Sequence, residues 1–169
     1  MESSPLDLAY SGPDLPLLDP FGESHWQHIF ELWLSNLQSE LAPELRAEAY
    51  SLGLQLCNDE AITALNANWR AKPEATDVLA FPAGPQLPLP GVPLELGDIV
   101  ISLETAARQA PDGLEQELCF LASHGLLHLL GWDHPDQAQL SAMLSRQQEL
   151  IELFPNQIGG IVPPSCPKR

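Results

Sequence analysis

Three histidines in the last third of the chain have the spacing of metal ligands. They stand in the run His124-Gly-Leu-Leu-His128-Leu-Leu-Gly-Trp-Asp-His134. Residues four apart lie on one face of a helix, and Gly131 can end that helix before the third histidine. This spacing predicts that three imidazoles bind one Zn²⁺ ion and leave its fourth tetrahedral position open for water. An open position is typical of a catalytic zinc site.

The same spacing is found in zinc peptidases with the pattern H-E-x-x-H-x-x-G-x-x-H, in which the glutamate activates the zinc-bound water. Gly125 occupies the position of that glutamate in this chain. The sequence therefore predicts a metal site without the usual peptidase base. A lone histidine in an apolar helix is more often a hydrogen-bonded core residue, but three of the five histidines in this register favour a metal site.

Composition sets the class of protein. The 169 residues, of which 44% are hydrophobic, suffice for one domain with a hydrophobic core. No apolar stretch is long enough to cross a bilayer, and the acidic start is unlike a secretory signal. Cys57, Cys119 and Cys166 form no C-x-x-C pair, which predicts buried or tail thiols in a reducing compartment. We expect a cytoplasmic protein.

The charge is strongly acidic, with 23 acids against 7 bases and a net charge of -16. This balance argues against broad electrostatic attachment to nucleic acid or to anionic membranes, so we expect no membrane and no DNA partner. A divalent ion held by neutral histidines keeps its full charge. Together with Arg70 and Lys72, such an ion can make one cleft locally positive.

The apolar pattern predicts four strands and five helices. The strands are expected over residues 6–10, 50–57, 77–81 and 97–102. The helices are expected over residues 26–37, 59–69, 103–108, 114–129 and 136–154. Asn58 and Ser102 are expected to cap two of them, and Trp69 to lie on a buried face. Five prolines predict an irregular loop up to residue 96.

These elements predict an α+β fold. We expect a small mixed sheet of about four strands packed by roughly five helices, in a single domain with a metal site over residues 1–154. Residues 155–169 are expected to form a flexible C-terminal tail. The continuous apolar run at 97–102 predicts a central strand covered on both faces, and the apolarity of 114–129 predicts a buried central helix. The metal would lie where that helix meets the next turn.

Four motifs occur in order along the chain. They are Leu65-Asn-Ala-Asn-Trp-Arg70, Thr76-Asp-Val-Leu-Ala-Phe-Pro82, Leu96-Gly-Asp-Ile-Val-Ile-Ser102 and the run of three histidines. Over residues 50–154 the chain resembles the YbeY family of bacterial rRNA maturation endoribonucleases. The resemblance implies an α+β fold and a zinc-dependent, single-strand-specific endoribonuclease. It also implies a role in 16S rRNA 3′-end maturation, ribosome biogenesis and quality control, with rRNA and the ribosomal small subunit as partners.

The resemblance also assigns residues. By motif position, His124, His128 and His134 match the metal ligands of the family, and Arg70 matches the arginine in its active-site cleft. The segment Ala71-Lys72-Pro73-Glu74-Ala75 departs from the family, whose members usually show a glycine, more charge and a proline directly before the threonine.

A mechanism follows as a hypothesis. Zn²⁺ can lower the pKa of bound water to about 7 and polarise a phosphoryl oxygen. Arg70 would bind and neutralise the scissile phosphate, because a guanidinium fits two phosphate oxygens. The alternative for Arg70 is a surface ion pair at a helix end. Asp133 can orient an imidazole, accept a proton or bond to its own backbone, and the sequence leaves these open.

Two other classes compete with the endoribonuclease. One is a zinc peptidase, which the missing glutamate at position 125 disfavours. The other is a non-catalytic ribosome-assembly factor in which zinc stabilises the fold. Asp77 and Asp98 are expected to be structural, and Trp69 and Trp132 to pack in the core, with stacking on RNA bases as the alternative for both tryptophans.

Overall fold

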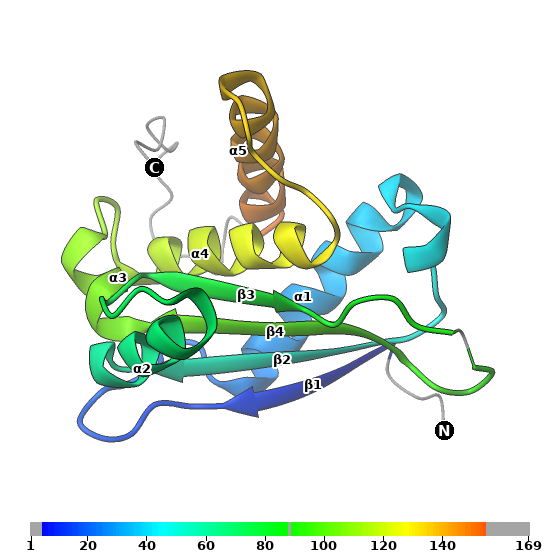
Figure 1. The fold of residues 1–169 in the computed structure, drawn as a ribbon. Coiled ribbons are helices and arrows are strands. Elements are labelled where there is room, and N and C mark those ends of the chain that lie inside the picture. The colour runs from blue at the N-terminus through cyan, green and yellow to red at the C-terminus, as the bar shows by residue number, and fades with distance from the viewer. Residues whose placement is uncertain (1–4, 88, 155–169) are drawn as a thin grey trace.

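The computed structural model describes residues 5–87 and 89–154, which form one sheet with helices on both faces (Figure 1). The strands are β1 (Leu6–Ser11), β2 (Tyr50–Cys57), β3 (Val78–Pro82) and β4 (Leu94–Ser102). The helices are α1 (Glu23–Leu37), α2 (Asp59–Arg70), α3 (Leu103–Gln109), α4 (Leu114–Leu129) and α5 (Gln137–Glu152). Two short 3₁₀ turns, η1 (Gln38–Glu40) and η2 (Pro43–Leu45), were not predicted. The predicted single-domain α+β class is confirmed.

The sheet is mixed and has the order β1-β2-β4-β3. β1 pairs parallel with β2, β2 pairs parallel with β4, and β3 runs antiparallel to β4 at the edge. Side chains alternate between the two faces of a strand, so Ile99 and Ile101 point into one core while Val100 points into another. The prediction of a strand covered on both faces is therefore confirmed for β4.

Two hydrophobic cores hold the layers together. The larger core joins α1, α4 and α5 to one face of the sheet, and Trp26, Phe30 and Trp33 are its largest side chains. The smaller core lies under α2 on the other face, around Ile62 and Val100. In Figure 1, α2 lies in front of the sheet and α1 behind it. α4 contacts β3, β4 and α5, so it is the element around which the site is built.

Side-chain caps begin three of the helices. Asn58 accepts a hydrogen bond from the backbone N–H of Ala61, and Ser102 accepts one from Thr105. Both predicted caps are confirmed. Asp136 does the same for α5, whose first turn follows the candidate site directly. Such caps satisfy backbone donors that the helix itself leaves unpaired.

Two expectations about position were wrong. β4 begins at Leu94, inside the segment predicted to be an irregular loop, because the Leu94 N–H donates to the Ala49 carbonyl and continues the pairing with β2. Trp69 is 71% exposed, although it was expected to be buried. Burial decreases along α2 from the fully buried Ile62 toward its C-terminal end, so Trp69 lies beyond the smaller core with its ring near Phe81.

The two described thiols are buried as expected, and the remaining histidines pack against aromatic rings. Cys57 and Cys119 are buried and free, and burial raises the pKa of Cys57 to about 11. His25 and His28 contact aromatic rings on or near α1. Cys166 and the predicted tail over residues 155–169 lie outside the described residues. Within the part of the chain that the structure describes, no helix combines the length and apolar character that crossing a membrane requires.

Candidate metal centre

The end of α4 positions the three histidines. His124 and His128 lie one helical turn apart, and the helix ends at Leu129. Gly131 then takes a φ of 98°, which favours glycine, while the Trp132 N–H donates to the Leu127 carbonyl. This tight reversal brings the next residues back beside the helix. The predicted stop at Gly131 is confirmed.

The three imidazoles converge on one point. The candidate ligand atoms of His124, His128 and His134 all lie within 4.8 Å of one another, and together they could hold a metal ion. The Nε2 atoms of His124 and His128 are 3.0 Å apart. His124 and His128 are half-buried, whereas His134 is exposed. The structure therefore brings together all three residues that the spacing singled out.

Hydrogen bonds to the outer ring nitrogens determine which nitrogen of each ring can bind a metal. His128 Nδ1 lies 3.0 Å from the backbone oxygen of Trp132. A carbonyl oxygen only accepts, so Nδ1 of His128 carries the proton and Nε2 keeps its lone pair. His124 Nδ1 lies 3.1 Å from Oε1 of Gln147 on α5. The second ring is therefore oriented by a side chain from a different helix.

Gln147 is a functional residue that the sequence reasoning missed. Its side chain is fully buried, and its Nε2 donates to the Phe120 carbonyl at 3.0 Å. That bond fixes which end of the amide faces His124, so Oε1 accepts the proton on Nδ1. In the sequence, Gln147 has the helical spacing of the apolar residues on one face of α5, such as Met143 and Leu150. A polar side chain at an apolar position was the signal that could have identified it.

The donor set fits a cation. With both protons on Nδ1, the lone pairs of two Nε2 atoms face each other across 3.0 Å, which is unfavourable unless a positive charge lies between them. Burial lowers the pKa of His124 and of His128, which keeps both rings in the neutral form that binds metals. Imidazole nitrogens suit Zn²⁺, Co²⁺, Ni²⁺ and Cu²⁺.

Arg70 ends α2 with an exposed side chain. Burial is the main cause of the lowered pKa of His128, and the positive charge of Arg70 lowers it further, so Arg70 acts electrostatically on this end of the cluster. Among the residues that the structure describes, the ion pairs of arginine involve Arg108 and Arg146. The described residues thus show no ion pair for Arg70, and its role stays a prediction.

The acidic residues near the site make contacts within the protein. Asp133 Oδ1 accepts the backbone N–H of His134 at 2.8 Å, and the Trp132 carbonyl lies against Nδ1 of His128. Asp77 Oδ1 accepts the N–H of Val78 at 2.8 Å. Asp98 lies over Gly53 on the neighbouring strand.

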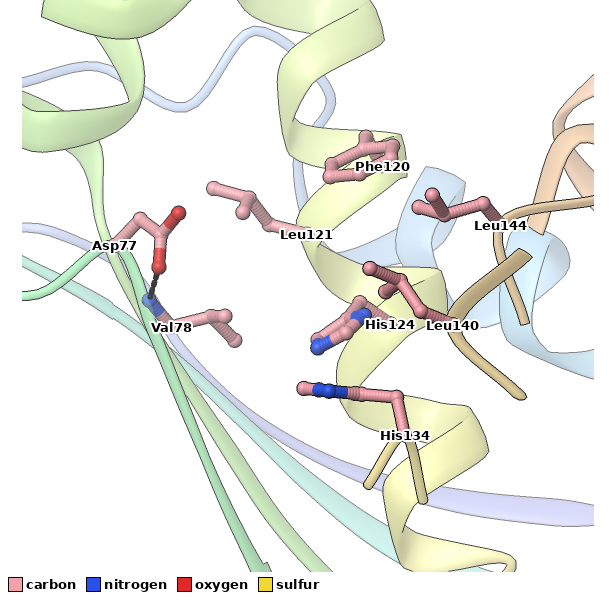
Figure 2. A pocket seen from close by; sticks show the side chains of 8 residues that line it. All are labelled: Asp77, Val78, Phe120, Leu121, His124, His134, Leu140 and Leu144. Carbon is pink, nitrogen blue, oxygen red and sulfur yellow. Dashed lines mark hydrogen bonds between the residues drawn. The ribbon is translucent and has the colours of Figure 1, made fainter. Parts of the chain in front are cut away.

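A pocket of about 180 Å³ adjoins the histidines (Figure 2). It lies between the start of β3, the middle of α4 and the first half of α5. Figure 2 shows His124 and His134 on one side and Asp77 across from them. The lining residues are mostly apolar: Asp77, Val78, Phe120, Leu121, His124, His134, Leu140 and Leu144.

The fold and the histidine cluster define an α+β protein with a candidate three-histidine metal centre at the end of its central helix. Residues 19–155 match the family model described as Endoribonuclease YbeY. A curated protein of that name from Synechococcus sp. (strain RCC307) is 59% identical over 87% of this chain and 92% of its own length. Another, from Nostoc sp., is 50% identical over 75% of this chain and 72% of its own length. This chain belongs to the endoribonuclease YbeY family.

A solved structure agrees on the fold. The solution structure of TM1509 from Thermotoga maritima has a TM-score of 0.50 and 24% sequence identity to this chain. The match covers 95% of this chain and 99% of that one. At this identity the likeness bears on the fold alone.

Proposed function

We propose that this protein is a zinc-dependent, single-strand-specific endoribonuclease of the cytoplasm that acts on rRNA of the small ribosomal subunit. Its role would be 16S rRNA 3′-end maturation, ribosome biogenesis and quality control. The observation that carries the proposal is the convergence of three histidine ligand atoms within 4.8 Å in a member of this family. Relatives that the chain covers over most of their length carry the name endoribonuclease.

His124, His128 and His134 are the proposed zinc ligands. Gln147 and the Trp132 carbonyl hold two of these rings with Nε2 directed at the ion. Three protein ligands leave one tetrahedral position for water or substrate. When bound, Zn²⁺ supplies a Lewis acid and lowers the pKa of a water ligand to about 7. His124 and His128 are half-buried and held by these hydrogen bonds, which favours a rigid metal site.

Arg70 is the proposed catalytic residue of the protein itself. Its guanidinium is exposed at the end of α2 and is not used in an ion pair within the described residues. A planar guanidinium binds two non-bridging phosphate oxygens at once and neutralises the charge that grows on them during cleavage. Arg70 would therefore position the scissile phosphate beside the metal centre.

Trp69 supports a single-stranded substrate. Its indole is 71% exposed and directly precedes Arg70. Exposed aromatic rings bind single strands because unpaired bases stack on them, and each such contact contributes about 1–3 kcal/mol. The exposure of Trp69 favours the stacking alternative over core packing for this residue. Trp132 is partly buried against the larger core and favours the structural role.

Cleavage of a single-stranded RNA by purified protein of known zinc content tests the proposal. We expect cleavage that follows zinc content, is lost in His128→Ala, and falls by at least about 100-fold in zinc-loaded Arg70→Ala. Arg70→Lys keeps the charge without the two-point contact and is expected to recover only part of the activity. Arg46→Ala removes an exposed arginine that follows η2 and donates to the Leu41 carbonyl, and this matched control is expected to stay active.

The same experiment separates the alternatives. A folded, zinc-loaded protein that cleaves no RNA, with or without small ribosomal subunits present, would overturn the endoribonuclease and favour a structural assembly factor. In that case zinc would only stabilise the fold, and chelation would lower the melting temperature. If the protein cleaved double-stranded RNA as fast as single-stranded RNA, the proposed strand specificity would be wrong and the endoribonuclease activity would stand.

A further inference from the structure

The two sides of the candidate metal centre differ in chemistry. Arg70, which would attract an anionic phosphate, is exposed at the end of α2 and does not line the pocket. His124 and His134 form part of the pocket wall, whereas His128 does not. Among the described residues that line this pocket there is no lysine or arginine, and Asp77 is the one carboxylate. An RNA strand bound across the metal centre would therefore place a phosphate at Arg70 and an uncharged group in the pocket.

The size of the pocket suits a single ring. Its volume is about 180 Å³. Sites that enclose a whole small-molecule ligand usually measure about 300–1,000 Å³. This space is therefore of the right order for one heterocyclic base, with the sugar and phosphate outside it.

The walls are suited to the faces of a flat ring. Phe120 and Leu121 project from α4, and Leu140 and Leu144 project from α5 (Figure 2). The ring of Phe120 is stacked near that of His124, with an interplanar angle of 15°. Bases that leave a helix or belong to a single strand are held between apolar and aromatic side chains in this way.

Asp77 provides the polar contact. Its Oδ1 accepts the Val78 N–H at 2.8 Å and its Oδ2 accepts Nε2 of Gln109 at 2.7 Å, so the carboxylate is held in one orientation. A carboxylate has about four acceptor positions. The Thr76 hydroxyl also donates to Oδ1, at 3.5 Å, so one position on Oδ2 is left for a ligand. Because the group only accepts, it favours a base edge that donates.

We propose that this pocket binds one unpaired RNA base next to the scissile phosphate, and that Asp77 selects a base with an exocyclic amino group. Cytosine and uracil are the informative pair, because they have the same size and differ at this edge. Cytosine presents an amino donor where uracil presents a carbonyl acceptor. The inference rests on the proposed function, since it assigns the base-binding part of the same site.

Methyl NMR on the zinc-loaded protein tests the pocket without any need for cleavage. Cytidine monophosphate and uridine monophosphate are titrated while the signals of Val78, Leu140 and Leu144 are followed. Both probes carry the same phosphate, so a difference between them reports on the base. We expect these methyl signals to shift, with cytidine monophosphate binding about tenfold more tightly.

Two variants sharpen the test. Asp77→Asn places an amide where the carboxylate was, and it is expected to abolish the preference for cytosine while the methyl shifts remain. Asp7→Asn makes the same charge change on β1, at the opposite edge of the sheet, and is expected to keep the preference. A preference that Asp77→Asn leaves unchanged would overturn the role of Asp77.

The outcomes distinguish the pocket from the proposed function. Cleavage of single-stranded RNA without methyl shifts from either nucleotide would overturn the base site and leave the endoribonuclease standing. Base-selective shifts in a protein that cleaves no RNA would overturn the proposed function and support the base site. Shifts produced by N-acetylleucinamide and by neither nucleotide would overturn the base site in favour of a contact for an apolar protein side chain.

Discussion

Gly125 on α4 packs directly against Ile99 on β4. A Cβ atom added at Gly125 would lie 2.9 Å from Cγ2 of Ile99 and 3.2 Å from its Cγ1, closer than side chains normally approach. The residue after the first histidine therefore faces the sheet and not the metal centre. A glutamate at this position would collide with the Ile99 side chain, which argues structurally against the peptidase alternative.

Replacing Gly125 should destabilise the protein. For Gly125→Ala we expect a loss of about 1–3 kcal/mol in the free energy of unfolding, because one extra methyl group overpacks the contact between α4 and β4. Chemical denaturation measures this change. Ser145→Ala, on an exposed part of α5, is the control and should remain within about 0.5 kcal/mol of the parent. An unchanged Gly125→Ala would contradict the close packing.

Gln147 should control metal affinity through His124. Gln147→Leu removes the acceptor for Nδ1, and we expect zinc to bind about 10–100-fold more weakly in competition with a chromophoric chelator. Gln147→Glu retains an acceptor and should bind zinc close to normally. Gln148→Leu alters the neighbouring residue, whose amide bonds to Glu152 away from the site, and serves as the control. Equal affinities for all three variants would remove Gln147 from the site.

The metal-free protein should lose stability as the pH falls below 6.5. Burial lowers the pKa of His124 and His128 from the ordinary value of 6.5, so the unfolded chain binds protons more readily than the folded chain. Stability therefore rises with pH while the unfolded histidines titrate and is fully present above 6.5, with a slope of at most about 1.4 kcal/mol per pH unit for each group.

Thermal unfolding with a chelator between pH 5 and 7.5 checks this pH dependence. The melting temperature should decrease on acidification through the lower part of this window. His128→Gln removes one titrating group and should flatten the curve. A melting temperature that increases on acidification would show that these imidazoles are stabilised in the charged form instead.

Replacing Ala71 with glycine should stabilise the protein. It directly follows α2 with a φ of 56°, and it is the one non-glycine residue with a positive φ among the described residues. A left-handed backbone conformation costs a residue with a Cβ atom about 1–2 kcal/mol, and glycine avoids this cost. Glycine also gives the unfolded chain more entropy, which offsets part of the gain. We expect Ala71→Gly to raise the melting temperature by about 2–4 °C, which corresponds to about 1 kcal/mol. A lower melting temperature would mean that this turn relaxes in solution.

Local geometry made part of the site predictable from sequence. The i, i+4 spacing of His124 and His128 places both rings on one helix face, and Gly131 allows the reversal that returns His134 to them. These relations depend on the conformation of about ten consecutive residues, so they needed no knowledge of the fold. The caps at Asn58 and Ser102 were predictable for the same reason.

Contacts between distant segments were decided only by the tertiary structure. Gln147 meets His124 because α5 packs on α4, and the exposure of Trp69 depends on where α2 runs past the sheet. The pocket also exists only where β3, α4 and α5 meet. A hydrophobic pattern indicates which face of an element is buried, but not which side chain of another element it meets. The sequence by itself determined the three candidate ligands, and packing decided what orients them and what lies beside them.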